Sequence, residues 1–134
     1  MYEKLLNQAK RDLKHAELSF KLEEYEWCCY ACRQAVYHAL KALLVHYGIE
    51  AISKQPIVLA RILEKEGKSL PELTKAVKKV EEIYSLIKYP DWSLEAPYEI
   101  LSEKEVKECI QNTRKILNYV EKLLKTDDDP REAK

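Results

Sequence analysis

The stretch ACRQAVYHALKALL at residues 31–44 decides the fold, because it divides around a helix into an apolar half and a polar half. Successive residues of an α-helix are turned by about 100°. The alanines, the leucines, Val36 and the cysteines just upstream fall on one half-turn, as a helix buried in a protein core requires. The opposite half carries Tyr30, Arg33, Gln34, Tyr37, His38 and Lys41. The stretch 31–44 itself contains no acidic residue, which makes this side a candidate binding face.

The helix that contains this stretch is predicted to run over residues 25–46, because Gly48 stands just past its end, where helix-ending glycines occur. A helix before it is predicted over residues 3–22, where apolar residues recur at spacings of three and four. A shorter helix is predicted over residues 56–66, with a proline at its first position and Gly67 after its last.

Capping sequences mark the start of two further helices. Residues 69–72, Ser-Leu-Pro-Glu, form a capping-box pattern with the serine as the cap. The helix that follows is predicted to end at Lys88, because Tyr89 precedes a proline and is pushed out of the helical region. Residues 102–105, Ser-Glu-Lys-Glu, form a second capping box and open a last helix that is predicted to reach about residue 125.

Four long helices and one short helix predict an all-α fold, an antiparallel up-and-down helical bundle. No segment alternates apolar and polar residues with the period of two that is typical of strands. The chain has 134 residues, 46% of them hydrophobic, which suits one domain with a conventional core. We predict that this domain spans residues 1–125 and that residues 126–134 form a flexible tail.

The charge balance limits what the surface as a whole can attract. Lys+Arg and Asp+Glu number 23 each, so no global positive field exists to hold a long nucleic acid, and any anion site must be local. The two glycines leave no glycine-rich phosphate loop. No apolar run approaches the roughly 18 residues of a membrane span, and the N-terminus lacks the pattern of a signal peptide. We therefore expect a cytoplasmic protein without membrane contact.

The four cysteines are expected to be reduced thiols. Cys28, Cys29 and Cys32 lie within two turns of one helix, where disulfide geometry is poor. Structural zinc requires four converging ligands, and neither His15 nor His46 has a suitably spaced acidic partner. We predict neither a metal site nor a cofactor.

A second candidate site follows the fourth predicted helix, in the segment KYPDW at residues 88–92. Lys88 offers a cation for a phosphate, and Tyr89 and Trp92 offer rings for base stacking. The alternative is a helix stop whose rings pack over the end of the bundle while Asp91 bonds turn amides. Both interpretations remain open on the sequence.

Three segments match a known family: AKRDLKHA at residues 9–16, RQAVYHALKALL at 33–44 and KYPD at 88–91. Through them, nearly the whole chain resembles the HEPN domain, a small all-helical module. The resemblance implies a bundle that usually dimerises, a nucleotide- or RNA-linked role, and frequent pairing with a minimal nucleotidyltransferase in toxin–antitoxin systems. Many members are metal-independent RNases with an Arg-x4–6-His motif, a spacing that Arg33 and His38 match.

The first functional hypothesis is a binding module. In this hypothesis a homodimer engages a nucleotide, RNA or a nucleotidyltransferase partner. The groups that bind are the segment 88–92 and four residues of the polar face, namely Tyr30, Gln34, Tyr37 and Lys41. A structural helical subunit without a ligand is the plainest alternative, with Arg33 and His38 acting as polar groups at a dimer or interhelix contact.

The remaining hypothesis is a metal-independent endoribonuclease. His38 would transfer a proton near neutral pH, and Arg33 would stabilise the charge on the phosphate. The two side chains diverge by about 140° around one helix. Only a dimer that brings two such helices together would aim both residues at one phosphate.

Overall fold

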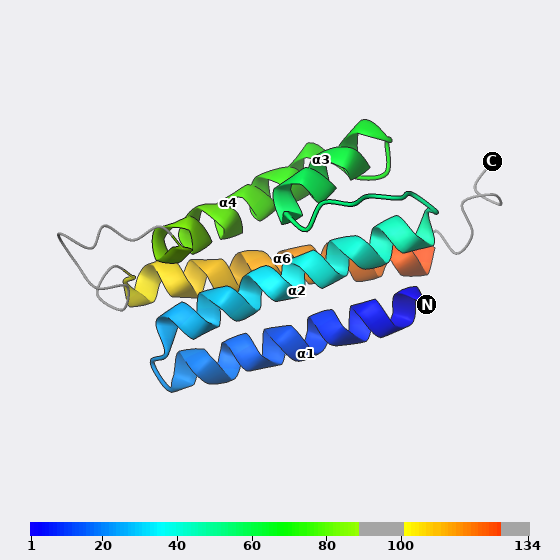
Figure 1. Ribbon diagram of the computed structural model, residues 1–134. Coiled ribbons are helices and arrows are strands. Elements are labelled where there is room, and N and C mark those ends of the chain that lie inside the picture. Colours follow the sequence, from blue (N-terminus) through cyan, green and yellow to red (C-terminus); the bar gives the residue numbers. More distant parts are fainter. Residues whose placement is uncertain (89–100, 127–134) are drawn as a thin grey trace.

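The computed structural model describes residues 1–88 and 101–126, which form five α-helices and no strand (Figure 1). The helices are α1 (Tyr2–Lys21), α2 (Tyr25–His46), α3 (Pro56–Lys65), α4 (Pro71–Lys88) and α6 (Glu103–Thr126). The all-α prediction is confirmed. The predicted bounds of the first three helices agree with the structure to within one residue. No helix in the described part of the chain is long and apolar enough to cross a membrane.

Helix α2 lies at the centre of the bundle and contacts the other four described helices. Figure 1 shows α1 along one side of α2 and the pair α3 and α4 along the other, and α6 packs against both α1 and α2. The apolar half of α2 is buried as predicted, and its largest side chains, Val36, Leu40, Leu43 and Leu44, are fully buried. The opposite half of α2 faces the space between α1 and the pair α3 and α4.

Small residues allow α1 to lie close to α2. Ala9 and Ala16 are the two buried residues of α1, and α2 buries alanines at 35, 39 and 42. Side chains of this size permit close approach of two helix backbones, so polar residues on the same face of α1 are brought within hydrogen-bond reach of α2. This packing positions the site described below.

Residues in the left-handed region end the first three helices. Gly48 after α2 and Gly67 after α3 both have φ of +69°, a conformation that glycine adopts without steric cost. After α2, the backbone N–H of Ile49 donates to Leu44 O at 2.9 Å, as in a Schellman motif. Glu23 has φ of 59° in the equivalent turn between α1 and α2, although its Cβ makes this conformation costly.

The two predicted capping boxes have different outcomes. At α6 the box is confirmed, because Glu105 N donates to Ser102 Oγ at 3.2 Å and Ser102 N donates to Glu105 Oε1 at 3.3 Å. At α4 it is wrong. The Ser69 hydroxyl is buried without a hydrogen-bond partner among the described residues. The helix begins at Pro71, and Leu70 N donates instead to the Tyr119 hydroxyl of α6 at 3.1 Å.

Candidate functional site

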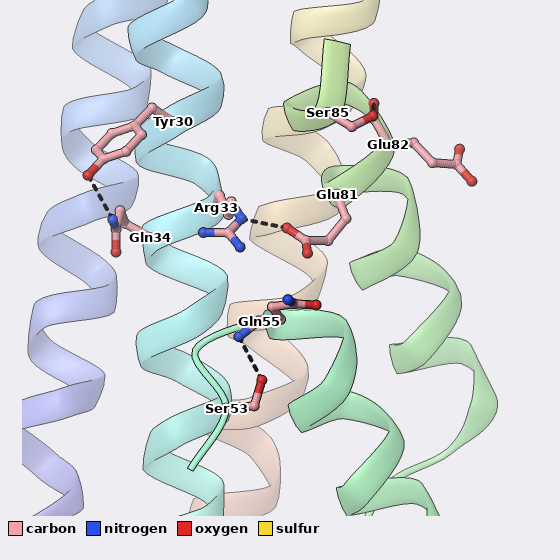
Figure 2. Close-up of polar contacts among 8 residues, drawn as sticks. All are labelled: Tyr30, Arg33, Gln34, Ser53, Gln55, Glu81, Glu82 and Ser85. Carbon is pink, nitrogen blue, oxygen red and sulfur yellow. Dashed lines mark hydrogen bonds and ion pairs between the residues drawn. The ribbon is translucent and has the colours of Figure 1, made fainter. Parts of the chain in front are cut away.

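The exposed part of α2 is a strip of polar and aromatic side chains, called here the α2 strip. Its members are Trp27, Tyr30, Gln34, Tyr37 and Lys41. Trp27 is 61% exposed and Tyr30 is 43% exposed, although rings of this size are usually buried. Gln34 Nε2 donates to the Tyr30 hydroxyl at 3.0 Å, which orders the middle of the strip (Figure 2).

Arg33 forms the edge of the α2 strip that faces α4. Its Nε donates to Glu81 Oε1 at 2.7 Å, and its guanidinium lies over the Tyr84 ring, 4.5 Å from the centroid. Figure 2 shows this side chain reaching from α2 to α4, whereas Tyr30 and Gln34 point toward α1. The side chains of Arg33 and Glu81 are 18% and 19% exposed, so their ion pair is mostly shielded from water. Arg33 therefore fastens α4 to α2.

His38 forms the opposite edge, which faces α1. Its Nδ1 lies 2.7 Å from Asp12 Oδ2, and Asp12 Oδ1 accepts a hydrogen bond from Gln8 Nε2 at 2.9 Å. Because an ionised carboxylate can only accept, Nδ1 carries the proton of this hydrogen bond. A carboxylate that holds Nδ1 in this way fixes the orientation of the ring and leaves Nε2 to exchange a proton with a substrate.

The two residues that complete these edges were missed by sequence reasoning. The one acid on the polar half of α2 is Glu26 in its first turn, and folding brings Asp12 and Glu81 against the two edges. A signal for Asp12 was available, because it lies three residues after Ala9 and four before Ala16, on the face that α1 buries. Glu81 likewise lies four residues after the buried Val77.

The far end of the α2 strip is occupied by intramolecular contacts. Lys41 Nζ donates to the backbone O of Ala51 at 3.2 Å, which ties the segment between α2 and α3 to α2. The Tyr37 ring meets the His38 ring at a centroid distance of 5.3 Å and an angle of 69°. Among the strip residues predicted to bind a ligand, Tyr30 is therefore the most open to solvent.

The second candidate site lies almost wholly outside the described residues. Lys88 is the last residue of α4, and Tyr89, Asp91 and Trp92 fall in the segment 89–100, which the structure does not describe. The prediction that this segment binds a ligand therefore stays a prediction.

The cysteines agree with the expectation of free thiols. Cys28, Cys29, Cys32 and Cys109 are all unpaired and buried. Hydrogen bonding with Cys32 and burial raise the pKa of the Cys28 thiol, and hydrogen bonding with Cys29 and Cys32, together with burial, raises the pKa of Cys109. Hydrogen bonding with Cys109 and Cys28 lowers the pKa of Cys32 instead. Neutral buried thiols such as Cys28 and Cys109 are poor nucleophiles. The described part of the chain contains no group of three His, Cys, Asp or Glu side chains that could hold a metal ion.

The fold and the strip define the class of protein as a small helical bundle with an open polar face on its central helix. The model of the HEPN domain matches residues 2–123, and the chain belongs to the HEPN domain family. It is 25% identical over 135 residues to a protein of Methanocaldococcus jannaschii named "Putative toxin MJ1304", with 92% of this chain and 89% of that protein covered.

Two solved structures are similar over nearly their whole length. TT1696 from Thermus thermophilus is 30% identical with a TM-score of 0.81, covering 92% of this chain and 98% of that one. ST0689, described as an archaeal HEPN homologue, is 29% identical with a TM-score of 0.75, covering 90% of this chain and 95% of that one. The resemblance predicted from the sequence is confirmed.

Proposed function

We propose that this protein is a toxin-like HEPN module that binds single-stranded RNA through the α2 strip. The observation that carries the proposal is the solvent-exposed pair of rings, Trp27 and Tyr30, on an otherwise well-packed central helix. Exposed rings stack on unpaired bases irrespective of sequence. The similarity to a protein named as a toxin supports a role in acting on a cellular macromolecule.

The amide and hydroxyl groups of the strip support recognition beside the stacking rings. Gln34 uses Nε2 to reach Tyr30, and its Oε1 accepts no hydrogen bond from the described residues. That oxygen remains available to an amino group on a base edge. Arg33 and His38 flank the strip, Arg33 in an ion pair with Glu81 and His38 as a cation only when its ring is protonated.

Fluorescence anisotropy with a labelled 12-nucleotide RNA tests the proposal. We expect Tyr30→Ala to weaken binding roughly tenfold, because one base–aromatic stack contributes about 1–3 kcal/mol. Leu70→Ala serves as the matched control, since it removes another exposed apolar side chain, 57% exposed, from the start of α4. Equal affinity of the wild type and Tyr30→Ala would show that the α2 strip is not the binding surface. If neither protein bound RNA, the result would favour a structural subunit without a ligand.

The second candidate function is metal-independent RNA cleavage, favoured by the orientation of His38. Asp12 holds Nδ1 at 2.7 Å, so Nε2 is the nitrogen that could take a proton from a ribose 2′-hydroxyl. Arg33 is engaged through Nε only, and its terminal nitrogens make no hydrogen bond to the described residues. They remain available to a phosphate.

Cleavage in EDTA tests this second candidate. His38→Ala is expected to lower the rate at least 100-fold, the usual scale of a lost general base. His46→Ala is the control, because it removes a histidine from the far end of the same helix. Cleavage that proceeds equally in both variants would contradict the assignment of His38.

A homodimer is part of the cleavage proposal. Arg33 and His38 lie on opposite edges of α2, so a second protomer is needed to bring one of each to the same phosphate. Light scattering on the eluted protein is expected to give twice the chain mass of 15.8 kDa. A strictly monomeric protein that still cleaved RNA would contradict this arrangement.

A nucleotidyltransferase is the proposed protein partner. The similarity to a protein named as a toxin supports a paired regulator, and the open α2 strip is a surface that such a regulator could cover. Co-expression with a nucleotidyltransferase encoded beside this chain should give a complex that survives gel filtration and is weakened by Tyr30→Ala. Separate elution of the two proteins would contradict the pairing.

A further inference from the structure

Beside the α2 strip lies a hollow of about 350 Å³ between α1 and α2, called here the aromatic hollow. Asp12 and His15 of α1 line one side, and Trp27, Tyr30 and Gln34 of α2 line the other. The Trp27 and Tyr30 rings meet edge to face, with centroids 6.1 Å apart and planes at 81°. A volume of this size is at the lower end of ligand pockets, which suits one base better than a large ligand.

A second hollow, of about 490 Å³, runs along the outer surface of α1 and is called here the basic hollow. It is lined by Lys4, Asn7, Gln8, Lys10, Arg11 and Lys14. Lys10 pairs with Glu121 of α6, whereas Lys4, Arg11 and Lys14 are exposed and form no ion pair with the described residues. In a protein with a net charge of zero, this is a local concentration of unpaired cations.

The two hollows adjoin each other on α1. Gln8 lines the basic hollow and donates to Asp12, which lines the aromatic hollow and holds His38. The distance along the helix from Lys4 to Ser19 is about 22 Å, at 1.5 Å per residue. The junction between the hollows is therefore the Asp12–His38 pair.

The acidic groups of this part of α1 are already engaged. Asp12 is held by His38 and Gln8. Glu17 accepts hydrogen bonds from Arg114 of α6, with 3.1 Å between Arg114 Nε and Glu17 Oε2. Glu17 is neutralised by Arg114, whereas Asp12 is neutralised only when the His38 ring is protonated. The exposed charges of the basic hollow that lack an ion pair are cations, and the exposed rings lie in the aromatic hollow.

We propose that these two hollows form one track for single-stranded RNA, with a base in the aromatic hollow and the following phosphates in the basic hollow. The inference rests on the proposed RNA binding and names where on the chain it occurs. It adds Arg11 and Lys14 of α1 to the binding residues of the α2 strip. A strand on this track passes a phosphate beside His38 at the junction. Duplex RNA is excluded because its bases are stacked within the helix.

Salt titration of RNA affinity separates the two parts of the track. Arg11→Ala with Lys14→Ala should weaken binding at least tenfold at low salt, and should reduce the slope of log affinity against log salt by about 1.4, or 0.7 for each lost contact. Trp27→Ala should weaken binding roughly tenfold with an unchanged slope, because it removes stacking without charge. Lys104→Ala with Lys107→Ala, two exposed lysines of α6, is the matched control and should leave both quantities unchanged.

The same experiment distinguishes the inference from the function on which it rests. If Arg11→Ala with Lys14→Ala binds RNA with the affinity and slope of the wild type, the track is overturned and the α2 strip remains the site. If Trp27→Ala also binds as the wild type does, the result counts against the α2 strip as well. Wild-type protein that binds no RNA would overturn both. Light scattering that shows Trp27→Ala converting a dimer to a monomer, with RNA affinity intact, would assign the aromatic hollow to a second copy of the chain. Circular dichroism on each variant checks that the helices are formed.

Discussion

The two edges of the α2 strip have the same kind of contact and similar burial but different neighbours, with side chains 18% and 19% exposed for Arg33 and Glu81 and 23% and 16% exposed for His38 and Asp12. At one edge Glu81 and the Tyr84 ring enclose Arg33. At the other edge Asp12 holds His38 at the same distance of 2.7 Å, but the hollow beside Asp12 is open and lined by exposed rings. A carboxylate therefore fastens a helix at the first edge and orients a side chain beside open solvent at the second.

A polar face on a central helix can therefore contribute to stability at one edge and to binding at the other. The Arg33 edge joins α2 to α4, so substitutions there should lower the free energy of unfolding strongly. The His38 edge joins α2 to α1, but α1 is also fastened to α6 through Lys10 and Glu121 and through Glu17 and its arginine partner. The His38 edge can thus be changed with less effect on folding.

The largest expected effect is on the Arg33 edge. Arg33→Ala should lower the free energy of unfolding by about 2 kcal/mol, because it leaves the carboxylate of Glu81 mostly buried without its charged partner and removes a cation from the Tyr84 ring. Urea denaturation followed by circular dichroism measures the change. The double variant with Glu81→Ala should cost less than the sum of the single variants. Strict additivity would show that the two residues do not interact.

The His38 edge should respond more weakly. His38→Ala is expected to lower the free energy of unfolding by about 1 kcal/mol, the scale of one hydrogen bond, because Asp12 keeps its hydrogen bond from Gln8. The same urea series provides the measurement. A loss as large as that of Arg33→Ala would remove the distinction between the edges.

A change at the joint between α1 and α2 gives a more stable background for these comparisons. Glu23→Gly should stabilise the protein by roughly 0.5–1 kcal/mol. Glycine relieves the left-handed strain of about 1–2 kcal/mol, and the greater conformational freedom of glycine in the unfolded chain offsets part of that gain. Thermal unfolding should shift upward while RNA affinity stays constant. Destabilisation would contradict the φ of 59° at this residue.

The smallest effect concerns the pairing of α1 with α6 and depends on pH. A hydrogen bond from Lys10 lowers the pKa of Glu121 below its ordinary value of 4.5. The contribution of the Lys10–Glu121 pair to the free energy of unfolding is therefore complete at pH values above the ordinary pKa of Glu121. It is lost as the pH falls through the lowered pKa of Glu121 in the folded state. Lys10→Ala should cost a few tenths of a kcal/mol at pH 7 and nothing at pH 2. A cost that persisted at pH 2 would contradict this origin.

Local signals explain why so much of the fold could be predicted. Periodicity and a following glycine placed α2 at Tyr25–His46, as observed, and the box at Ser102 and Glu105 formed because both partners belong to one turn. The box at Ser69 did not form, because the Ser69 hydroxyl has no partner among the described residues and the helix begins at Pro71, next to Leu70, whose amide donates to a hydroxyl 49 positions away. Local propensity is a weak prior where contacts from distant parts of the chain surround a helix start.

The candidate site was only half predictable for the same reason. The polar half of α2 follows from helical geometry within one segment. Its acidic partners come from positions 26 residues before His38 and 48 residues after Arg33, and no pattern within α2 indicates them. Trp27 was missed although the sequence of α2 places it on the polar half, because at about 100° per residue it falls between Gln34 and His38.

The most direct test of the proposed binding surface is an NMR titration of the 15N-labelled full chain with single-stranded RNA. The account predicts that the indole N–H of Trp27 and the side-chain amide of Gln34 shift together as RNA is added. The signal of the Arg33 Nε–H should keep its chemical shift, because Glu81 already accepts the hydrogen bond from this group. A shift of the Arg33 signal while the Trp27 and Gln34 signals stay unchanged would contradict the account.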